Sequence, residues 1–391
     1  MVIFKLRKYD LKLYALFTVV STLAGVSSVY FIKDAYGSYE FADFALSTVY
    51  VQIVVALSDL GMRYSFFKPK SFFSERSNFM YLIALKVVIA LTLFLISLIF
   101  YHTSIYLAHL PMVLGFVLFP TLLFQRYKLF TIIALNNFLF RVLPMIGLLF
   151  FSQIEGFVVF SGLILFSNSL LANMLSGVFS EGRFKYNYFK RIGLNVLNDN
   201  RFLSALSVIN ILEVYVHVFL AKVFLTKDIF SEFMYIERYT NYVKQVVVYL
   251  YDFFYPKIVI DNINSYQKYV RKAAFLIAFG VATFLFLEAY GGWIFQGFNS
   301  YVLIIAMAIV PAFILLFNFV QSTVYFKYCS DKRGVIIVLT AVVLKLLIFF
   351  VTQPFIGVLA IPLGLVSAEI YMGIRRAIAV HAELDVKVQF F

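Results

Sequence analysis

Residues 13–32 read LYALFTVVSTLAGVSSVYFI, a run of 20 residues without a charged side chain. About 20 apolar residues are what a helix needs to cross the hydrocarbon core of a bilayer. A basic start of Lys5, Arg7, Lys8 and Lys12 precedes the run, as in a signal peptide. The run exceeds the roughly 7 to 15 residues of a signal-peptide apolar region, and further apolar runs follow at once. We therefore expect an uncleaved first transmembrane helix.

Composition extends this conclusion to the whole chain. Of its 391 residues, 63% are apolar and 14% are charged, against about 45 to 50% and about 25% in soluble domains. The sequence predicts an all-α integral membrane protein with about 12 transmembrane helices and no soluble domain. The predicted spans are residues 12–32, 41–61, 79–101, 108–124, 129–151, 156–178, 202–224, 232–256, 273–290, 300–325, 334–351 and 357–374.

The distribution of positive charge supports twelve spans with both termini in the cytoplasm. With this topology, 25 of the 33 Lys and Arg residues lie in cytoplasmic segments, two lie outside, and six lie within spans. Cytoplasmic loops of membrane proteins carry such an excess of Lys and Arg. The net charge of +13 is therefore attributed to cytoplasmic loops, and we expect no nucleic-acid partner. Omitting the polar eighth span would move Arg271, Lys272, Lys332 and Arg333 outside.

The longest central loop, residues 179–201, divides the chain into two sets of six spans. We predict an N-terminal lobe over residues 1–190 and a C-terminal lobe over residues 191–391. The string FFKPK at residues 66–70 ends the second span of the first half, and FFYPK at residues 253–257 ends the equivalent span of the second half. Arg141 and Lys345 also lie near the middle of the fifth span of each half. The sequence therefore indicates a parallel pseudo-repeat.

Several kinds of active site are excluded by their missing motifs. The sequence contains no Gly-Lys dipeptide, hence no phosphate-binding P-loop, and neither His-Glu-x-x-His nor Gly-x-Ser-x-Gly. Cys329 is the single cysteine. We expect a non-enzymatic protein without a metal or cofactor, and we expect His102, His109 and His381 to be solvated residues at span ends or in the tail.

Polar residues follow one side of three predicted spans. Charged side chains at the centre of a spanning helix cost about 2.5 to 3.5 kcal/mol on insertion scales, so they indicate partners or a water-filled cavity. In the eighth span the polar residues recur every three or four positions, which places them on one face of a helix. The residues are Arg238, Asn241, Tyr242, Gln245, Tyr249 and Asp252, with Glu237 and Lys244 beside them; the seventh span adds Asn210, Glu213, His217 and Lys222, and the second adds Thr48, Gln52 and Asp59.

Two interpretations of these charges stay open. Glu213, Glu237 and Asp252 either neutralise basic neighbours and hold helices together, or line a transport cavity. Arg141 and Lys345 lie too deep to extend to the surface, so burial against a partner competes with cavity lining. For Lys86, near the inner end of its span, extension to the membrane surface is favoured.

The first 70 residues resemble a known family. Phe17-Thr18-Val19 through Gly25, then residues 36–42 (YGSYEFA), then residues 58–61 (SDLG) with Arg63 resemble the N-terminal region of bacterial O-antigen repeat-unit flippases. These belong to the multidrug/oligosaccharidyl-lipid/polysaccharide exporter superfamily. The resemblance implies a MATE-like fold, in which two six-helix lobes surround a cavity lined by the spans that start at residues 12, 41, 202 and 232.

The resemblance also implies transport of a glycan on undecaprenyl diphosphate from the cytoplasmic to the periplasmic leaflet of the bacterial inner membrane. Lys222, Arg238 and Lys244 would then offer positive charge to the diphosphate, and Asn241 and Gln245 suit sugar hydroxyls. Asp59, Glu213 or Asp252 would bind a coupling proton or sodium ion. Expected partners are the lipid-linked oligosaccharide, membrane lipids, and the polymerase and assembly proteins of surface polysaccharide.

Two alternatives to a flippase remain. A drug or metabolite exporter of the same fold would favour a more apolar cavity dominated by acidic groups. A membrane polysaccharide polymerase or ligase would need an outside loop of tens of residues, whereas the longest predicted outside stretch is about residues 291–299. The sequence therefore favours transport.

Overall fold

The computed structural model describes residues 10–59, 76–126, 129–176, 201–242 and 331–384. It divides into two compact units, Met1–Ile211 and Leu212–Phe391, which are considered separately. Every regular element in the described ranges is a helix. The predicted lobe boundary between residues 190 and 191 lies outside these ranges, as do the predicted spans 273–290 and 300–325, so the two six-helix lobes stay a prediction.

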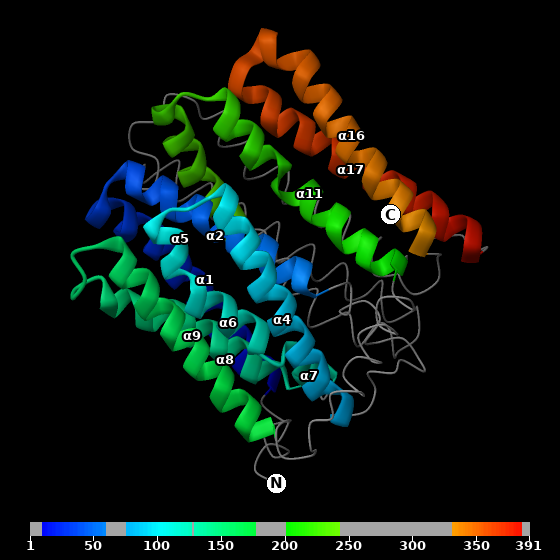
Figure 1. Cartoon of the computed structure of the whole chain (residues 1–391). Coiled ribbons are helices and arrows are strands. Elements are labelled where there is room, and N and C mark those ends of the chain that lie inside the picture. Colours follow the sequence, from blue (N-terminus) through cyan, green and yellow to red (C-terminus); the bar gives the residue numbers. More distant parts are fainter. Residues whose placement is uncertain (1–9, 60–75, 127–128, 177–200, 243–330, 385–391) are drawn as a thin grey trace. The chain divides into compact units, whose positions relative to one another are not determined.

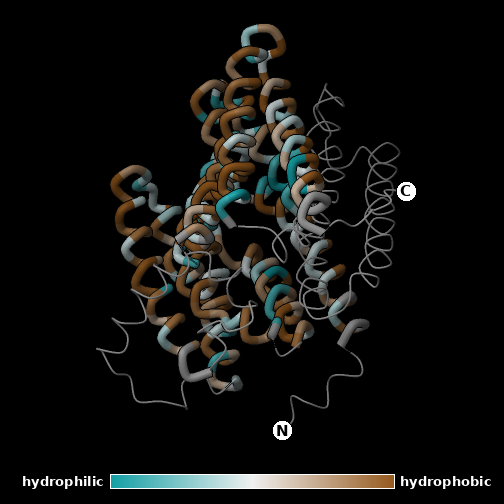
Figure 2. The backbone as a smooth tube through the Cα atoms, turned by 90° about the vertical axis from the view of Figure 1, so that its right-hand side faces the viewer, coloured by the Kyte–Doolittle hydropathy of each residue, from teal (hydrophilic) through white to brown (hydrophobic). Residues whose placement is uncertain are grey.

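The described helices include eight candidate membrane spans, which makes the chain a multi-pass membrane protein and confirms the all-α fold class. The candidates are Leu16–Tyr36, Ser38–Ser58, Phe79–Phe100, Ser104–Gln125, Phe130–Gly147, Ile154–Met174, Ser204–Phe224 and the 48-residue Lys332–Ala379, which contains two helices. Figure 2 shows the apolar colouring that dominates these helices.

The first unit opens with two long helices joined by one residue. Helix α1 (Asp10–Tyr36) and helix α2 (Ser38–Ser58) meet at Gly37, whose φ is 86°. A residue with a side chain adopts this left-handed conformation only at a cost, whereas glycine does so readily. Glycine therefore allows the chain to reverse between the two spans.

The predicted span 108–124 is broken into pieces. After α4 (Arg76–Phe100), the chain forms α5 (Ser104–Ala108), α6 (Leu110–Leu118) and α7 (Thr121–Arg126). The Thr103 side chain caps α5 by accepting a hydrogen bond from the main-chain N–H of Tyr106 at 3.1 Å. Pro111 stands at the start of α6 and Pro120 just before α7. Because proline has no N–H to donate, it favours a helix start over a helix interior.

Two further helices, α8 (Phe130–Gly147) and α9 (Ile154–Ser176), complete the described part of this unit. Helix α1 packs on α8, and α6 packs on α9. At the second contact a Cβ on Gly115 would lie 2.8 Å from the main-chain nitrogen of Phe166, so glycine is required for the close approach. Ser169 Oγ donates to the Gly115 carbonyl at 2.7 Å. Small residues and such hydrogen bonds are typical of helix contacts inside membranes.

The second unit contains most of α11 (Arg201–Phe224), a helical stretch over residues 227–242, and a helical hairpin. The hairpin consists of α16 (Asp331–Ile356), the 3-10 turn Gly357–Leu359 and α17 (Ala360–Leu384). Figure 1 shows α16 and α17 side by side. A Cβ on Gly364 of α17 would lie 2.9 Å from the carbonyl oxygen of Lys345 on α16. The hairpin is therefore closely packed beside Lys345.

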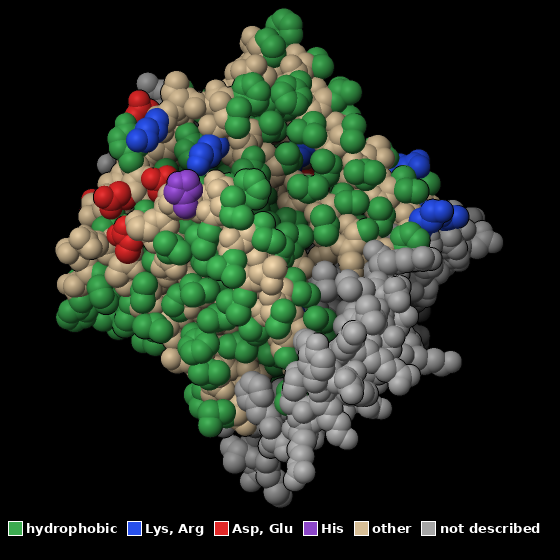
Figure 3. All heavy atoms as spheres, in the orientation of Figure 1, with side chains coloured by type: hydrophobic (Ala, Val, Ile, Leu, Met, Phe, Trp, Pro, Cys, Tyr) green, Lys and Arg blue, Asp and Glu red, His purple; other side chains and the backbone are tan. Residues whose placement is uncertain are grey.

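Large apolar side chains are exposed on many described helices. Ile99 is 75% exposed, Leu149 82% and Phe355 85%. Figure 3 shows apolar side chains across much of the visible described surface. A soluble protein rarely exposes apolar patches of this extent, whereas a bilayer solvates them.

Candidate functional site in the membrane-spanning helices

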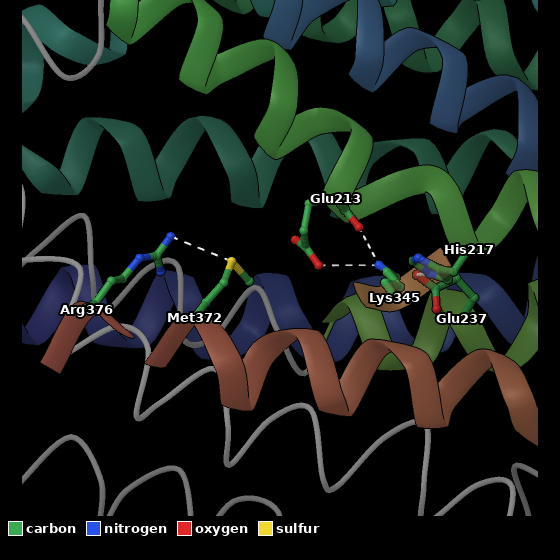
Figure 4. A network of polar contacts seen from close by, with 6 residues as sticks. All are labelled: Glu213, His217, Glu237, Lys345, Met372 and Arg376. Carbon is green, nitrogen blue, oxygen red and sulfur yellow. Dashed lines mark hydrogen bonds and ion pairs between the residues drawn. The ribbon is translucent and has the colours of Figure 1, made fainter. Parts of the chain in front are cut away.

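A cluster of buried polar side chains connects three helical segments of the second unit (Figure 4). Glu213 and His217 come from α11, Glu237 from the stretch 227–242, and Lys345 from α16; all four are at most 5% exposed. His217 Nε2 lies 3.1 Å from Glu237 Oε1, and Lys345 Nζ lies 3.3 Å from Glu213 Oε1. Lys345 also donates to the main-chain carbonyl of Glu213.

The α-helical repeat explains why two polar side chains lie together on α11. Glu213 and His217 are four residues apart, so they lie on the same face, as the sequence predicted. A buried charge is costly unless an opposite charge and hydrogen bonds offset its loss of hydration. Glu213 has Lys345 and Glu237 has His217, so each of these two acids has a basic partner. The partner of Lys345 that the sequence left open is therefore Glu213.

The first unit contains a more exposed ion pair between two helices. Lys86 of α4 pairs with Asp59, the residue that follows α2, and the side chains are 20% and 22% exposed. A carboxylate at a helix C-terminus faces the negative end of the helix dipole. The Lys86 ammonium offsets that repulsion. Lys86 thus reaches a carboxylate at the end of the neighbouring helix.

Arg141 contacts the main chain of a neighbouring helix. This half-buried residue of α8 donates from Nη1 to the carbonyl oxygen of Ser21 on α1 at 3.2 Å. Ser21 is fully buried. The contact joins the two helices at a depth where the sequence indicated a partner or a cavity.

The expectation that His109 is solvated is wrong. His109 is fully buried at the junction between α5 and α6. Its Nδ1 lies 2.7 Å from the carbonyl of Ile105, its Nε2 lies 3.3 Å from Thr48 Oγ1, and its ring stacks on Phe44. His109 lies between the end of α5 and the start of α6, and its ring contacts α2 through Thr48 and Phe44. Thr48, predicted to belong to a polar stripe, is 8% exposed and contacts this histidine. His102 is exposed, as expected.

Tyrosines near this histidine pack on one another. Tyr50 and Tyr101 stack with ring centroids 4.6 Å apart, and Tyr106, fully buried, lies against both. Burial raises the pKa of the Tyr101 hydroxyl, which lies between two candidate spans, above its ordinary value of 10. The hydroxyl therefore stays protonated and donates to the main-chain carbonyl of Asp43.

Comparison with known proteins identifies the fold. No family model matches the sequence, and no curated protein matches it. Solved structures do match along nearly the whole chain. An outward-facing multidrug resistance MATE family transporter of the MOP superfamily is 13% identical, with a TM-score of 0.66 over 96% of this chain and 97% of that chain. This chain has the MATE fold.

Two further structures share the fold. A mutant of the Vibrio cholerae MATE transporter VcmN is 13% identical, with a TM-score of 0.62 over 98% of each chain. A MOP superfamily transporter from Pyrococcus furiosus, described as having a binding pocket of reverse polarity that suggests a different function, is 13% identical, with a TM-score of 0.55 over 95% of this chain and 93% of that chain. The MATE-like fold predicted from the sequence is confirmed.

The predicted site residues are only partly within the described ranges of this MATE-fold chain. Lys244, Gln245 and Asp252 lie outside them. Arg238 and Asn241 are half-buried, and Lys222 is exposed. The structure brings Glu213 and His217 together with Glu237 and Lys345, and brings Asp59 together with Lys86.

Sequence analysis missed one buried charge. Arg376 was counted with the cytoplasmic tail, but the structure places it within α17, 8% exposed. Its Nη2 lies 3.8 Å from Met372 Sδ (Figure 4). Ile374 and Ile378 are four residues apart, so apolar helical spacing continues beyond residue 374, and this signal was available in the sequence. Among the described residues, no group of three or more His, Cys, Asp or Glu is arranged to hold a metal.

Proposed function

We propose that the protein is a flippase that moves an undecaprenyl-diphosphate-linked oligosaccharide, an O-antigen or related repeat unit, from the cytoplasmic to the periplasmic leaflet by alternating access. The observation that carries the proposal is the MATE fold along 96% of the chain, because the matching solved structures are transporters. The resemblance of residues 17–63 to O-antigen flippases supports this substrate over others of the same fold. The proposed location is the bacterial inner membrane, with both termini cytoplasmic.

Charge within the helices suits an anionic carrier lipid. Glu213 and Glu237 have basic partners, and we assign these pairs to helix packing. We assign the diphosphate to Arg238, Lys244 and Lys222, since a charge-assisted hydrogen bond to phosphate is stronger than a neutral one. The membrane potential also favours this direction, by up to about 2.3 kcal/mol per negative charge and 100 mV.

Other assignments follow from the same proposal. Asn241 and Gln245 offer amide groups to sugar hydroxyls. A proton or sodium ion bound at Asp59 or Asp252 would couple transport to an ion gradient, whereas Glu213, the third candidate from the sequence, is assigned to its pair with Lys345. Polysaccharide polymerase and assembly proteins are the proposed partners, because they would receive the translocated unit.

Gene deletion in a bacterium that makes surface polysaccharide tests the proposal. We expect lipid-linked repeat units to accumulate on the cytoplasmic face and surface polysaccharide to disappear. Complementation with Arg238→Gln should leave surface polysaccharide low at normal expression. Arg333→Gln is the matched control, because Arg333 is exposed on the first turn of α16. Normal surface polysaccharide in the deletion strain would refute the proposal.

A drug or metabolite exporter is the second candidate. It is favoured by the match to a multidrug resistance transporter. In that case the deletion strain would become sensitive to toxic cations or dyes while its surface polysaccharide stayed normal. The same strain therefore separates the two candidates.

A further inference from the structure

Two of the membrane-embedded cations, Arg141 and Lys345, share a mode of contact. Arg141 comes from the fifth predicted span of the first half and donates to the main-chain carbonyl of Ser21 on α1. Lys345 comes from the fifth predicted span of the second half and donates to the main-chain carbonyl of Glu213 on α11. In each case the acceptor lies near the middle of the first span of the same half.

Apolar contacts accompany each polar contact. Tyr14 and Phe17 of α1 lie against Phe130 and Phe138 of α8, with ring centroids 6.0 and 5.4 Å apart. Their order along both helices shows that α1 and α8 run in the same direction, with Arg141 following the second pair. In the other unit, Phe224 of α11 lies 5.3 Å from Phe349 of α16.

We propose that Arg141 and Lys345 are equivalent positioning residues, each of which fixes the fifth helix of its half to the first helix through a main-chain carbonyl. A carbonyl oxygen has two lone pairs, so one inside a helix can accept a side-chain donor in addition to its helical N–H. A main-chain acceptor is present whatever side chain the residue carries. The contact can therefore hold two helices together in both halves although the acceptor residues, Ser21 and Glu213, differ.

The alternative role for both cations is binding of substrate in the cavity. The structure argues against it for Lys345, which is 1% exposed and has both the carboxylate and the carbonyl of Glu213 as acceptors. Gly364 of α17 covers the same residue from the hairpin. The positioning role predicts that α1 with α8, and α11 with α16, move as pairs during the transport cycle. The paired movement rests on the proposed function, whereas the contact between the fifth and first helices does not.

The test uses crosslinking between α1 and α8 in the full chain. In a Cys329→Ser background, cysteines replace Phe17 and Phe138, and a short thiol-reactive crosslinker is applied in membranes. Arg141→Gln should lower the rate of crosslinking. It should also raise the rate of proteolysis of the purified protein by about tenfold, because a larger fraction of molecules would have α1 separated from α8. Ser21→Ala, the matched control, keeps the carbonyl and should match the parent in both measurements.

A second variant keeps the test decisive if Arg141→Gln does not fold. Arg141→Lys retains a long side chain that ends in a donor, whereas the glutamine amide is shorter, so Arg141→Lys should keep most of the crosslinking. Surface polysaccharide, the readout that depends on the proposed function, should return to the Arg141→Gln strain when the introduced cysteines are crosslinked. Unchanged crosslinking and proteolysis in Arg141→Gln would overturn the positioning role, whether or not transport is lost. Loss of crosslinking in Ser21→Ala or in Arg141→Lys would overturn it as well.

Discussion

Replacing Lys345 by Met removes the cation of the buried pair on α11 and α16 while keeping a long, unbranched side chain. Lys345 is 1% exposed and Glu213 is 5% exposed, so little water can reach the carboxylate that remains. Removing one partner of a buried ion pair typically costs about 3 to 5 kcal/mol. We expect Lys345→Met to lower the free energy of unfolding by this amount.

The partner variant and the double variant make the prediction specific. Glu213→Gln should cost less than Lys345→Met, because Lys345 keeps the main-chain carbonyl of Glu213 as an acceptor. In the double variant no unpaired charge is buried, so about 2 to 3 kcal/mol of the summed loss should be recovered. The coupling energy is the difference between the loss in the double variant and the sum of the two single losses, and it measures the strength of the Lys345–Glu213 interaction.

Equilibrium unfolding of the purified protein in mixed detergent micelles provides the free energies. Lys332→Met is the control, because Lys332 is exposed at the start of the same helix and its replacement should change stability by less than about 0.5 kcal/mol. Additive losses in the double variant would show that Lys345 and Glu213 do not interact, and would refute the reasoning.

Three further predictions use the same unfolding measurement. Gly364→Leu should cost about 1 to 3 kcal/mol, because its Cβ would meet the carbonyl of Lys345 at 2.9 Å; wild-type stability would contradict the close packing of the hairpin. Lys86→Gln should cost at most about 1 kcal/mol, since its pair with Asp59 is one-fifth exposed; a larger loss would indicate a buried pair. His109→Leu should cost about 1 to 3 kcal/mol, because Thr48 and the carbonyl of Ile105 lose a partner; an unchanged midpoint would exclude a stabilising role for the ring.

The sequence was sufficient to predict the spans that lie on described residues, since their lengths and apolar composition follow from the thickness of the bilayer. Ten of the twelve predicted spans fall at least partly on described residues, and each of these ten contains helix there. The sequence did not predict that residues 104–126 form three short helices. The break follows from Pro111 and Pro120, which favour helix starts, and from the Thr103 cap, and a hydropathy window registers none of these.

The polar contacts were less predictable than the helices. Helical spacing placed Glu213 and His217 on one face. Their partners, Lys345 and Glu237, lie on other helical segments, so only the tertiary structure could identify them. Glu237 stands next to Arg238 in the sequence, and the structure pairs Glu237 with His217 of another helix. His109 was misjudged because its position at the end of a predicted span implied contact with solvent.

Translocation by the purified protein tests the central proposal most directly. Proteoliposomes would contain the protein, a fluorescently labelled undecaprenyl-diphosphate oligosaccharide, and an impermeant reagent that quenches lipid in the outer leaflet. The account predicts that wild-type protein exchanges lipid between leaflets, so quenching exceeds the fraction initially outside, and that Arg238→Gln slows this exchange while Arg333→Gln does not. Quenching equal to that of protein-free liposomes, from a protein shown to be folded and inserted, would contradict the proposed flippase function.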